Sequence, residues 1–496
     1  MTKLYQKETK IVLAILFLKL ILIYLIPITG DEVYFIKWAT NLSSGYYDHP
    51  PMVGWLIYLM KFISSSFVFF RMFGFFAAIV VAYSIYKIAL LYTEKQKAIF
   101  VGLIFLASPI DMLMSLFTND IPLVMFGTLG TMFLLYSFEK ERGTSYAVLS
   151  GIFLAFAFLS KYFTGFLLIS LVMFIAIKYK TKALKNGLIV AFIVSLAIAQ
   201  NLYFNYNSCW NNIMFNFFAR TSDKYSINGI LNLFVNLLYI TTPWGIYFIY
   251  KSRQNFKNSD LLTLIYLILG LMFVVFFMVS LKNLTYLHWY VLFAPYIFLL
   301  FVFLDTTLLQ KLFRYNVIFT YIHIVIAFAA LFVLYIATPQ ILIKHKNYSD
   351  ITLAMHNKDV CKILQRDYND KKIFTVGYTT ASMLSYGCNK PVHMIFTNSK
   401  FGRLDDKLVD VRELDKSSIY IFDNRVLKKS DFDNVCKEVD IDTFKLNKAT
   451  FYMATCKDFD YNKYKKYYLD IEKKRFYTIP KWLPKGKCYF LDRYYK

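Results

Sequence analysis

The chain has 496 residues, of which 57% are hydrophobic and 19% aromatic, and this composition excludes a soluble globular protein. Its formal net charge is +24, but no basic stripe with a binding motif is present, so we expect no nucleic acid partner. Much of the positive charge lies in short loops between apolar segments, where it orients a membrane protein and meets membrane lipids. We therefore predict a polytopic α-helical membrane protein.

Apolar segments occur along the first two thirds of the chain. A helix that crosses a bilayer needs about 20 apolar residues, and on this criterion we predict about eleven transmembrane helices. Segment 53–70 is interrupted by Lys61 and three serines, so we interpret it as an interfacial helix. We expect the first apolar segment to stay in the protein, because it has no small-residue cleavage site. The predicted spans are 11–28, 72–92, 98–116, 120–138, 145–160, 162–178, 184–204, 230–250, 259–279, 287–304 and 315–337.

Lysine and arginine residues cluster in alternate loops if segment 53–70 does not span the membrane. Short loops rich in these residues mark the cytoplasmic side. The N-terminus is then cytoplasmic, and residues 341–496 form an extracytoplasmic domain, which in a bacterial inner membrane is periplasmic.

This topology collects many polar residues at the outer face. Ionisable residues at membrane depth are costly and usually functional, although each could also be an interfacial charge that snorkels to water. Together they predict an outward-facing cavity that holds both carboxylates and cations. The residues are Asp31, Glu32, Asp48, His49, Asn119, Asp120, Lys161, Asn205, Arg220, Lys224, Lys282 and His288.

The C-terminal part predicts a small α/β domain. Five of the six cysteines lie in it and Cys209 lies in an outer loop, so disulfides are permitted, but the sequence does not choose their pairing. No CxxC motif or His/Cys cluster indicates a structural zinc site. The predicted strands are 372–377, 418–422 and 450–455, and the predicted helices are 380–386 and 430–439.

Several short motifs lie at the predicted outer face: Gly30-Asp31-Glu32 with Tyr34, Gly45-Tyr46-Tyr47-Asp48-His49-Pro50-Pro51, Asn119-Asp120-Ile121-Pro122-Leu123, Ser160-Lys161-Tyr162, Asn205 with Trp210, and His288-Trp289 followed by Pro295. Together they resemble the polyprenyl-phosphate-dependent glycosyltransferases of the C-type superfamily. The branch with bacterial aminoarabinose transferase and the protein O-mannosyltransferases is the most similar. The resemblance implies a transmembrane glycosyltransferase domain at 1–340, with a catalytic first outer loop at 29–71. The domain at 341–496 carries little of this resemblance.

The resemblance also implies an inverting transfer of a sugar from an undecaprenyl-phosphate-type donor. The acceptor would be lipid A, a surface glycan or a protein. Asp31 matches the family's catalytic acid and would serve as the general base for the acceptor hydroxyl. Glu32 and Asp120 would orient the acceptor or brace the first loop.

The leaving phosphate is already an anion and needs cations rather than a general acid. The candidates are Lys161, Arg220, Lys282 and His49. The substrate cavity would include Tyr34, Tyr47, Asp48, Asn205 and His288, and a divalent metal ion could bind at Asp48 and His288. The aminoarabinose enzyme has a carboxylate and a lysine before its Pro-Pro pair, where this chain has Asp48 and His49.

Two alternatives concern Asp31 and the class of protein. Asp31 could instead cap a short helix that begins at Glu32, and as a base it would benefit from desolvation that raises its pKa. A transporter or flippase for lipid-linked sugars would also have many spans. We expect such a protein to show charges at the bilayer midplane and paired broken helices, whereas the helices predicted here are nearly uninterrupted.

Overall fold

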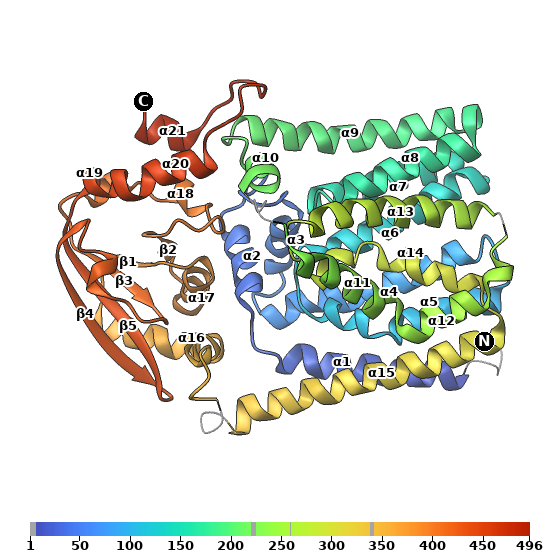
Figure 1. Cartoon of the computed structure of the whole chain (residues 1–496), viewed down its shortest axis with the longest axis horizontal. Coiled ribbons are helices and arrows are strands. Elements are labelled where there is room, and N and C mark those ends of the chain that lie inside the picture. The colour runs from blue at the N-terminus through green and yellow to red at the C-terminus, as the bar shows by residue number, and fades with distance from the viewer. Residues whose placement is uncertain (1–5, 220–224, 258, 338–341) are drawn as a thin grey trace. The chain divides into compact units, whose positions relative to one another are not determined.

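The computed structural model describes residues 6–219, 225–257, 259–337 and 342–496, and Figure 1 shows the course of the chain. The chain forms two compact units that do not divide at residue 340. The helical unit comprises Met1–Leu25, Phe62–Gln200 and Thr221–Ala329. The sheet unit comprises Ile26–Lys61, Asn201–Arg220 and Ala330–Lys496, so residues 29–61 of the predicted first outer loop fold with the C-terminal domain, whereas residues 62–71 belong to the helical unit.

The helical unit contains most of the predicted spans. Six helices of the described chain are long and apolar enough to cross a membrane, or up to nine if each bent pair is one span, so the predicted count of eleven is not confirmed. The helices are α1 (Gln6–Leu25), α4 (Phe67–Ala89), α5 (Lys95–Leu106), α6 (Asp120–Glu139), α7 (Gly143–Ser160), α8 (Thr164–Lys178), α9 (Leu184–Tyr206), α11 (Ile227–Thr241), α12 (Pro243–Lys251), α13 (Asp260–Ser280), α14 (Ala294–Leu299) and α15 (Thr306–Phe332).

Prolines break two of the predicted spans. Segment 98–116 is α5 followed by a 3₁₀ helix from Pro109, bent by 59°, and segment 230–250 is α11 and α12, bent by 73° at Thr242. Proline lacks an N–H group and disfavours helical geometry at the residue before it. Segment 287–304 is likewise a series of short helical pieces. The expectation of nearly uninterrupted helices is therefore wrong.

A buried ion pair joins the first helix to the break after α5. Lys19 Nζ lies 2.9 Å from Asp111 Oδ1 and also donates to the Asp111 carbonyl, and both side chains are buried. Neither residue was among the predicted candidates. The pair neutralises two charges that would otherwise be expensive at this depth.

The sheet unit holds a five-stranded mixed sheet in the order β2-β1-β3-β5-β4. β1 pairs in parallel with β2 and β3, whereas β5 pairs antiparallel with β3 and β4. The strands are β1 (Ile373–Thr375), β2 (His393–Met394), β3 (Ile419–Asp423), β4 (Cys436–Leu446) and β5 (Ala449–Phe459). The helices are α2 (Gly30–Thr40), α3 (Met52–Lys61), α10 (Asn211–Ile213), α16 (Tyr348–Asp367), α17 (Tyr378–Cys388), α18 (Asp405–Leu408), α19 (Tyr461–Tyr464), α20 (Asp470–Phe476) and α21 (Tyr489–Tyr494).

Two helix predictions differ from the structure. Segment 430–439 is a short 3₁₀ turn followed by β4, because its residues pair with β5 across the tight turn at Asn447 and Lys448. The interfacial helix expected at 53–70 is the shorter α3, which ends at Lys61, and α4 already begins at Phe67. The three predicted strands and helix 380–386 are confirmed within a few residues.

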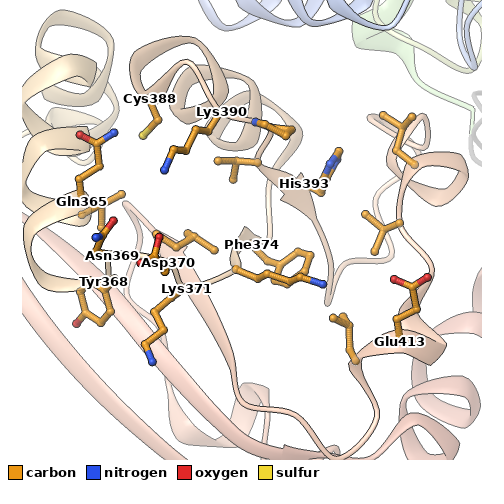
Figure 2. A pocket seen from close by; sticks show the side chains of 18 of the residues that line it. Gln365, Tyr368, Asn369, Asp370, Lys371, Phe374, Cys388, Lys390, His393 and Glu413 are labelled. Carbon is orange, nitrogen blue, oxygen red and sulfur yellow. The ribbon is translucent and has the colours of Figure 1, made fainter.

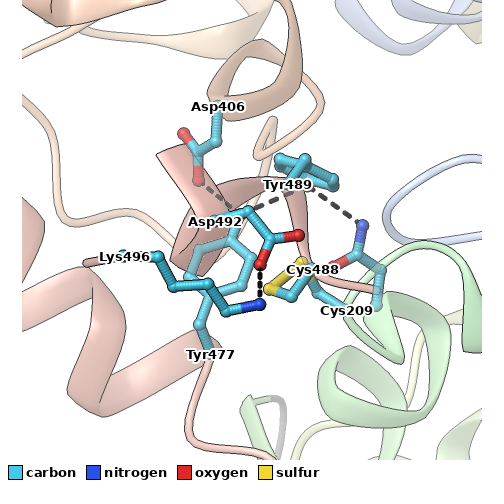
Figure 3. Close-up of a disulfide and its surroundings, with 8 residues drawn as sticks. Cys209, Asp406, Tyr477, Cys488, Tyr489, Asp492 and Lys496 are labelled. Atoms are coloured by element: carbon cyan, nitrogen blue, oxygen red, sulfur yellow. Dashed lines mark hydrogen bonds and ion pairs between the residues drawn. A yellow bond between two sulfur atoms is a disulfide. The ribbon is translucent and has the colours of Figure 1, made fainter. Parts of the chain in front are cut away.

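All six cysteines form disulfides, which resolves the pairing that the sequence left open. The pairs are Cys209–Cys488, Cys361–Cys388 and Cys436–Cys456, all within the sheet unit. Cys209–Cys488 joins residues 279 positions apart and connects the end of α9 to the start of α21. Figure 3 shows this bridge and its polar surroundings.

Helix α2 packs directly on α17 of the C-terminal domain. A Cβ atom at Gly30 would lie 2.8 Å from Thr379 Cγ2, so the two helices approach too closely there for a larger residue. Lys37 Nζ, at the other end of α2, lies 2.7 Å from Asp405 Oδ1, and both side chains are buried. Burial would raise the pKa of Asp405, but Lys37 and His393 hold it at about 2.

We expect the Cys209–Cys488 bridge to contribute to the stability of the sheet unit. Replacing both cysteines by alanine should lower the free energy of unfolding by about 2–5 kcal/mol, the usual effect of losing a native disulfide. Thermal melts of the full chain in detergent measure this change. Treating the parent with reductant should lower its melting temperature, while the same treatment should affect the double variant less.

We also expect an acid-dependent loss of stability from Asp405. Its folded-state pKa of about 2 lies below the ordinary value, so its contribution is present above about pH 4 and is lost as the pH falls through 2. Asp405→Asn should remove this pH dependence and destabilise the chain by about 3–5 kcal/mol, because Lys37 stays buried without its partner. Thermal melts between pH 2 and about 6 measure this pH dependence, and a variant at an exposed carboxylate, Asp433→Asn, is the control. Equal pH dependence in Asp405→Asn and parent would contradict it.

Candidate active site

Asp31 lies in the first turn of α2, where a carboxylate suits the positive end of the helix dipole. The N-cap is Thr29, so the alternative in which Asp31 caps a helix beginning at Glu32 is wrong. Asp31 is exposed rather than buried, so the structure does not supply the desolvation proposed from the sequence. The hydroxyl of Tyr378 donates to Asp31 Oδ1 at 3.3 Å.

Glu32 closes a capping box at the same helix end. Its Oε2 accepts from the backbone N–H of Thr29 at 3.1 Å and from the Thr29 hydroxyl at 3.0 Å, while Glu32 N donates to Thr29 Oγ1. This reciprocal pattern satisfies donors that a helix N-terminus otherwise leaves open. The buried carboxylate of Glu32 therefore fixes the start of the helix that carries Asp31.

Two tyrosines connect the first-loop carboxylates. Tyr34 donates to Asp48 Oδ1 at 3.1 Å, and its ring meets the ring of Tyr378 edge to face at 5.1 Å. Burial, with Asp31 and Asp48 nearby, raises the pKa of Tyr378, so this phenol stays protonated and remains a donor. Sequence analysis missed Tyr378: it is one of 40 tyrosines, and no motif surrounds it.

The other sheet-unit candidates have different surroundings. Tyr47 is buried and its ring contacts Phe215, and His49 is half-buried with its ring 6.1 Å from that of Trp38. Asn205 is fully buried: its amide donates to Asn201, and its Oδ1 accepts from the N–H of Asn212. Asn205 thus supports a turn, and its place in the substrate cavity stays a prediction.

Asp120 and Lys161 of the helical unit form an ion pair. Lys161 Nζ lies 2.6 Å from Asp120 Oδ1, and both side chains are more than nine-tenths buried. Asp120 begins α6 and Lys161 follows the last residue of α7, so two adjacent helix ends hold the pair. Lys161 can still bind an anion such as a phosphate while it is paired with Asp120, but the carboxylate offsets part of its positive charge.

The remaining candidates in the described structure make contacts with aromatic rings. Lys282 Nζ lies 5.5 Å from the ring centre of Tyr225, and His288 is exposed and stacks on Tyr286. Arg220 and Lys224 lie outside the described residues. No group of three His, Cys, Asp or Glu residues suited to a metal is found in the described parts of the chain. The suggested metal site at Asp48 and His288, which belong to different units, stays a prediction.

Two sizeable cavities lie in the described part of the sheet unit. The larger has a volume of about 410 Å³, and Figure 2 shows that Tyr368, Lys371, Phe374, Lys390 and Glu413 surround it. None of the candidate residues lines this cavity. The smaller has a volume of about 250 Å³ and includes Tyr47 in its wall.

Part of the chain matches a known family. Residues 48–204 match the family model of dolichyl-phosphate-mannose-protein mannosyltransferases. Lipid A galacturonosyltransferase RgtD from Rhizobium johnstonii (strain DSM 114642 / LMG 32736 / 3841) is 25% identical over 181 residues. This match covers 35% of the present chain and 38% of the length of that relative.

The fold as a whole is shared with a solved structure. ArnT from Cupriavidus metallidurans bound to undecaprenyl phosphate superposes with a TM-score of 0.64 at 13% identity, covering 91% of this chain and 98% of ArnT. Its apo state gives a TM-score of 0.60. The resemblance of this chain to the C-type polyprenyl-phosphate-dependent glycosyltransferases, stated above from its motifs, is therefore confirmed.

Proposed function

We propose that this protein is an inverting glycosyltransferase that moves a sugar from a polyprenyl-phosphate donor to a glycolipid or other surface glycan. The observation that carries the proposal is Asp31, a solvent-exposed carboxylate on a capped helix that accepts a hydrogen bond from Tyr378. The ArnT-like fold and the match to RgtD support a lipid-phosphate donor and a glycolipid acceptor.

In this proposal Asp31 takes the proton from an acceptor hydroxyl as its oxygen attacks the anomeric carbon. The bond from that carbon to the phosphate oxygen breaks, and the polyprenyl phosphate leaves with the electron pair. A single displacement inverts the anomeric centre. No general acid is needed, because the leaving group departs as an anion that cations stabilise.

Lys161, Lys282, His49 and Arg220 are the proposed phosphate-binding residues. Arg220 would suit bidentate contact, and the lysines would act as point charges. Asp120 then holds the ammonium group of Lys161 in place, since a buried charge without a partner is costly. We propose this positioning role for Asp120 in place of a direct catalytic one.

We further propose that the sheet unit faces the extracytoplasmic side of a bacterial inner membrane. The support is that every cysteine of the chain forms a disulfide within this unit. Structural disulfides persist in oxidising compartments and are rare in the cytosol. A donor carried by a membrane lipid is available at that face.

Two features of the structure resemble those expected of a transporter. Broken helices and the buried Lys19–Asp111 pair are present in the helical unit. The ArnT-like fold over nine-tenths of the chain nevertheless favours the transferase. Incubating purified protein with undecaprenyl-phosphate sugars and acceptor lipid A separates the two, because a transporter would release no free undecaprenyl phosphate.

Asp31→Asn should lower the transfer rate by about 10²–10⁴-fold, because an amide accepts no proton. Folding should be unchanged, since Thr29 and not Asp31 caps α2. Glu32→Gln is the matched control, because glutamine also serves in a capping box. Mass spectrometry of the glycosylated product measures the rate. If Asp31→Asn kept more than about a tenth of the parent rate, Asp31 would not be the base.

Tyr378→Phe should shift the pH dependence of transfer. A hydrogen bond to an ionised carboxylate favours its charged form, so losing the Tyr378 hydroxyl should raise the pKa of Asp31. The acidic limb of the pH–rate profile should then move to higher pH, with little change in rate at high pH. A purely structural role for Tyr378 would lower the rate by the same factor at every pH.

Lys161→Gln should raise the KM for the lipid donor and lower kcat, because the phosphate gains charge as the bond breaks. Asp120 would then be buried without its partner, and a loss of stability could obscure the kinetics. The double variant Lys161→Gln with Asp120→Asn removes both charges and serves as the folding control. If it melts like the parent and transfers at the parent rate, Lys161 does not bind the phosphate.

A further inference from the structure

The smaller cavity of the sheet unit is built from three chain segments. Its walls come from residues 41–47 of the first loop, from residues 204–211 at the end of α9, and from residues 404–408, and the single residue Tyr489 completes them. All three segments belong to the same compact unit. Leu42 and Lys407 are exposed, so the cavity of about 250 Å³ opens to solvent.

A disulfide and a chain of hydrogen bonds fix these walls. Cys209–Cys488 joins the segment that carries Asn211 to the one that carries Tyr489. The Asn211 amide donates to the Tyr489 hydroxyl. Figure 3 shows the continuation: the Tyr489 hydroxyl contacts the Tyr477 hydroxyl, and Tyr477 donates to Asp406. Such a network pre-organises the cavity, because its walls cannot separate without breaking the bridge.

Polar groups of the cavity wall remain unsatisfied in the described structure. The hydroxyl of Tyr47 and the carboxamide oxygen of Asn211 are buried and have no hydrogen-bond partner among the described residues. If the oxygen and nitrogen of the Asn211 amide exchanged places, the NH₂ group would lack a hydrogen-bond partner instead of the oxygen. An unsatisfied buried polar group destabilises the folded protein, so two in one wall indicate that something else supplies their hydrogen bonds.

The chemistry of the wall selects a ligand class. Phe204 and Tyr489 supply aromatic rings, while Asn41, Ser43 and Ser208 add amide and hydroxyl groups. Lys407 is the one charged residue among the lining residues, and they include no carboxylate. A sugar ring has apolar C–H faces and a rim of hydroxyl groups, so it matches aromatic faces combined with amide and hydroxyl partners.

We propose that this cavity is a saccharide-binding subsite for one pyranose residue, neutral or negatively charged, of the acceptor glycan. Its volume is slightly below the range of about 300–1,000 Å³ for drug-sized ligands, which suits a single ring. The identity of the ligand as part of the acceptor rests on the proposed function, whereas the presence of a saccharide site does not. The subsite would hold the glycan by a sugar other than the one that reacts.

Saturation-transfer NMR on the full chain in detergent tests the subsite directly. The probes are methyl α-D-glucopyranoside and the methyl α-glycoside of galacturonic acid, each without lipid donor. We expect saturation transfer to the ring protons of at least one probe. Tyr47→Phe keeps the ring and removes the unpartnered hydroxyl, so it should weaken binding at least fivefold without lowering the melting temperature. Tyr368→Phe, the same change in the larger cavity, should bind like the parent.

Comparing the two glycosides shows whether the charge of Lys407 contributes to binding. Lys407→Gln should weaken binding of the uronate alone if its charge contacts the ligand carboxylate, and should leave the glucoside unaffected. Asp31→Asn should bind both probes like the parent although it transfers no sugar, which separates this proposal from the proposed function. Absence of saturation transfer to both probes in the parent, or parent-like binding by Tyr47→Phe, would overturn the proposal.

Discussion

The buried ion pair between Lys37 and Asp405 is the interaction on which the candidate site depends. It ties the far end of α2 to the C-terminal domain, while the near end is held by the close contact of Gly30 with Thr379. A charge pair without water is stable only when its remaining hydrogen bonds are made, and the Asp405 carboxylate also accepts from Met394 N. The helix that carries Asp31 is thus fixed at both ends.

This attachment changes the interpretation of the C-terminal domain. From the sequence, residues 341–496 are a separate extracytoplasmic domain that carries little of the resemblance to the glycosyltransferases. In the structure this domain contributes Tyr378, whose hydroxyl reaches Asp31. The domain therefore takes part in positioning the first loop.

The candidate carboxylates differ in what their surroundings allow. Glu32 is engaged by Thr29, Asp48 accepts from Tyr34, and Asp120 pairs with Lys161. Each of these three side chains is buried, whereas Asp31 is exposed. A general base must reach a substrate hydroxyl, so accessibility as well as motif distinguishes Asp31 from the other acids.

The sequence by itself determined the class of protein, the helical character of most apolar segments, and the motifs around Asp31. These depend on composition and local pattern, which a single chain displays directly. It also contains local signals for features that the predictions missed: Pro109 and Pro243 mark the breaks in two spans, and Asn447 lies in the turn of the hairpin that replaces a predicted helix.

Only the tertiary structure decided which residues meet across long separations. The pairings Cys209–Cys488, Lys37–Asp405 and Tyr378–Asp31 each join residues more than 250 positions apart. Any lysine can pair with any aspartate, so their energies carry no local sequence signature. Which partners meet is fixed when apolar surfaces of the whole unit pack, and that is why the first loop and the C-terminal domain form one unit.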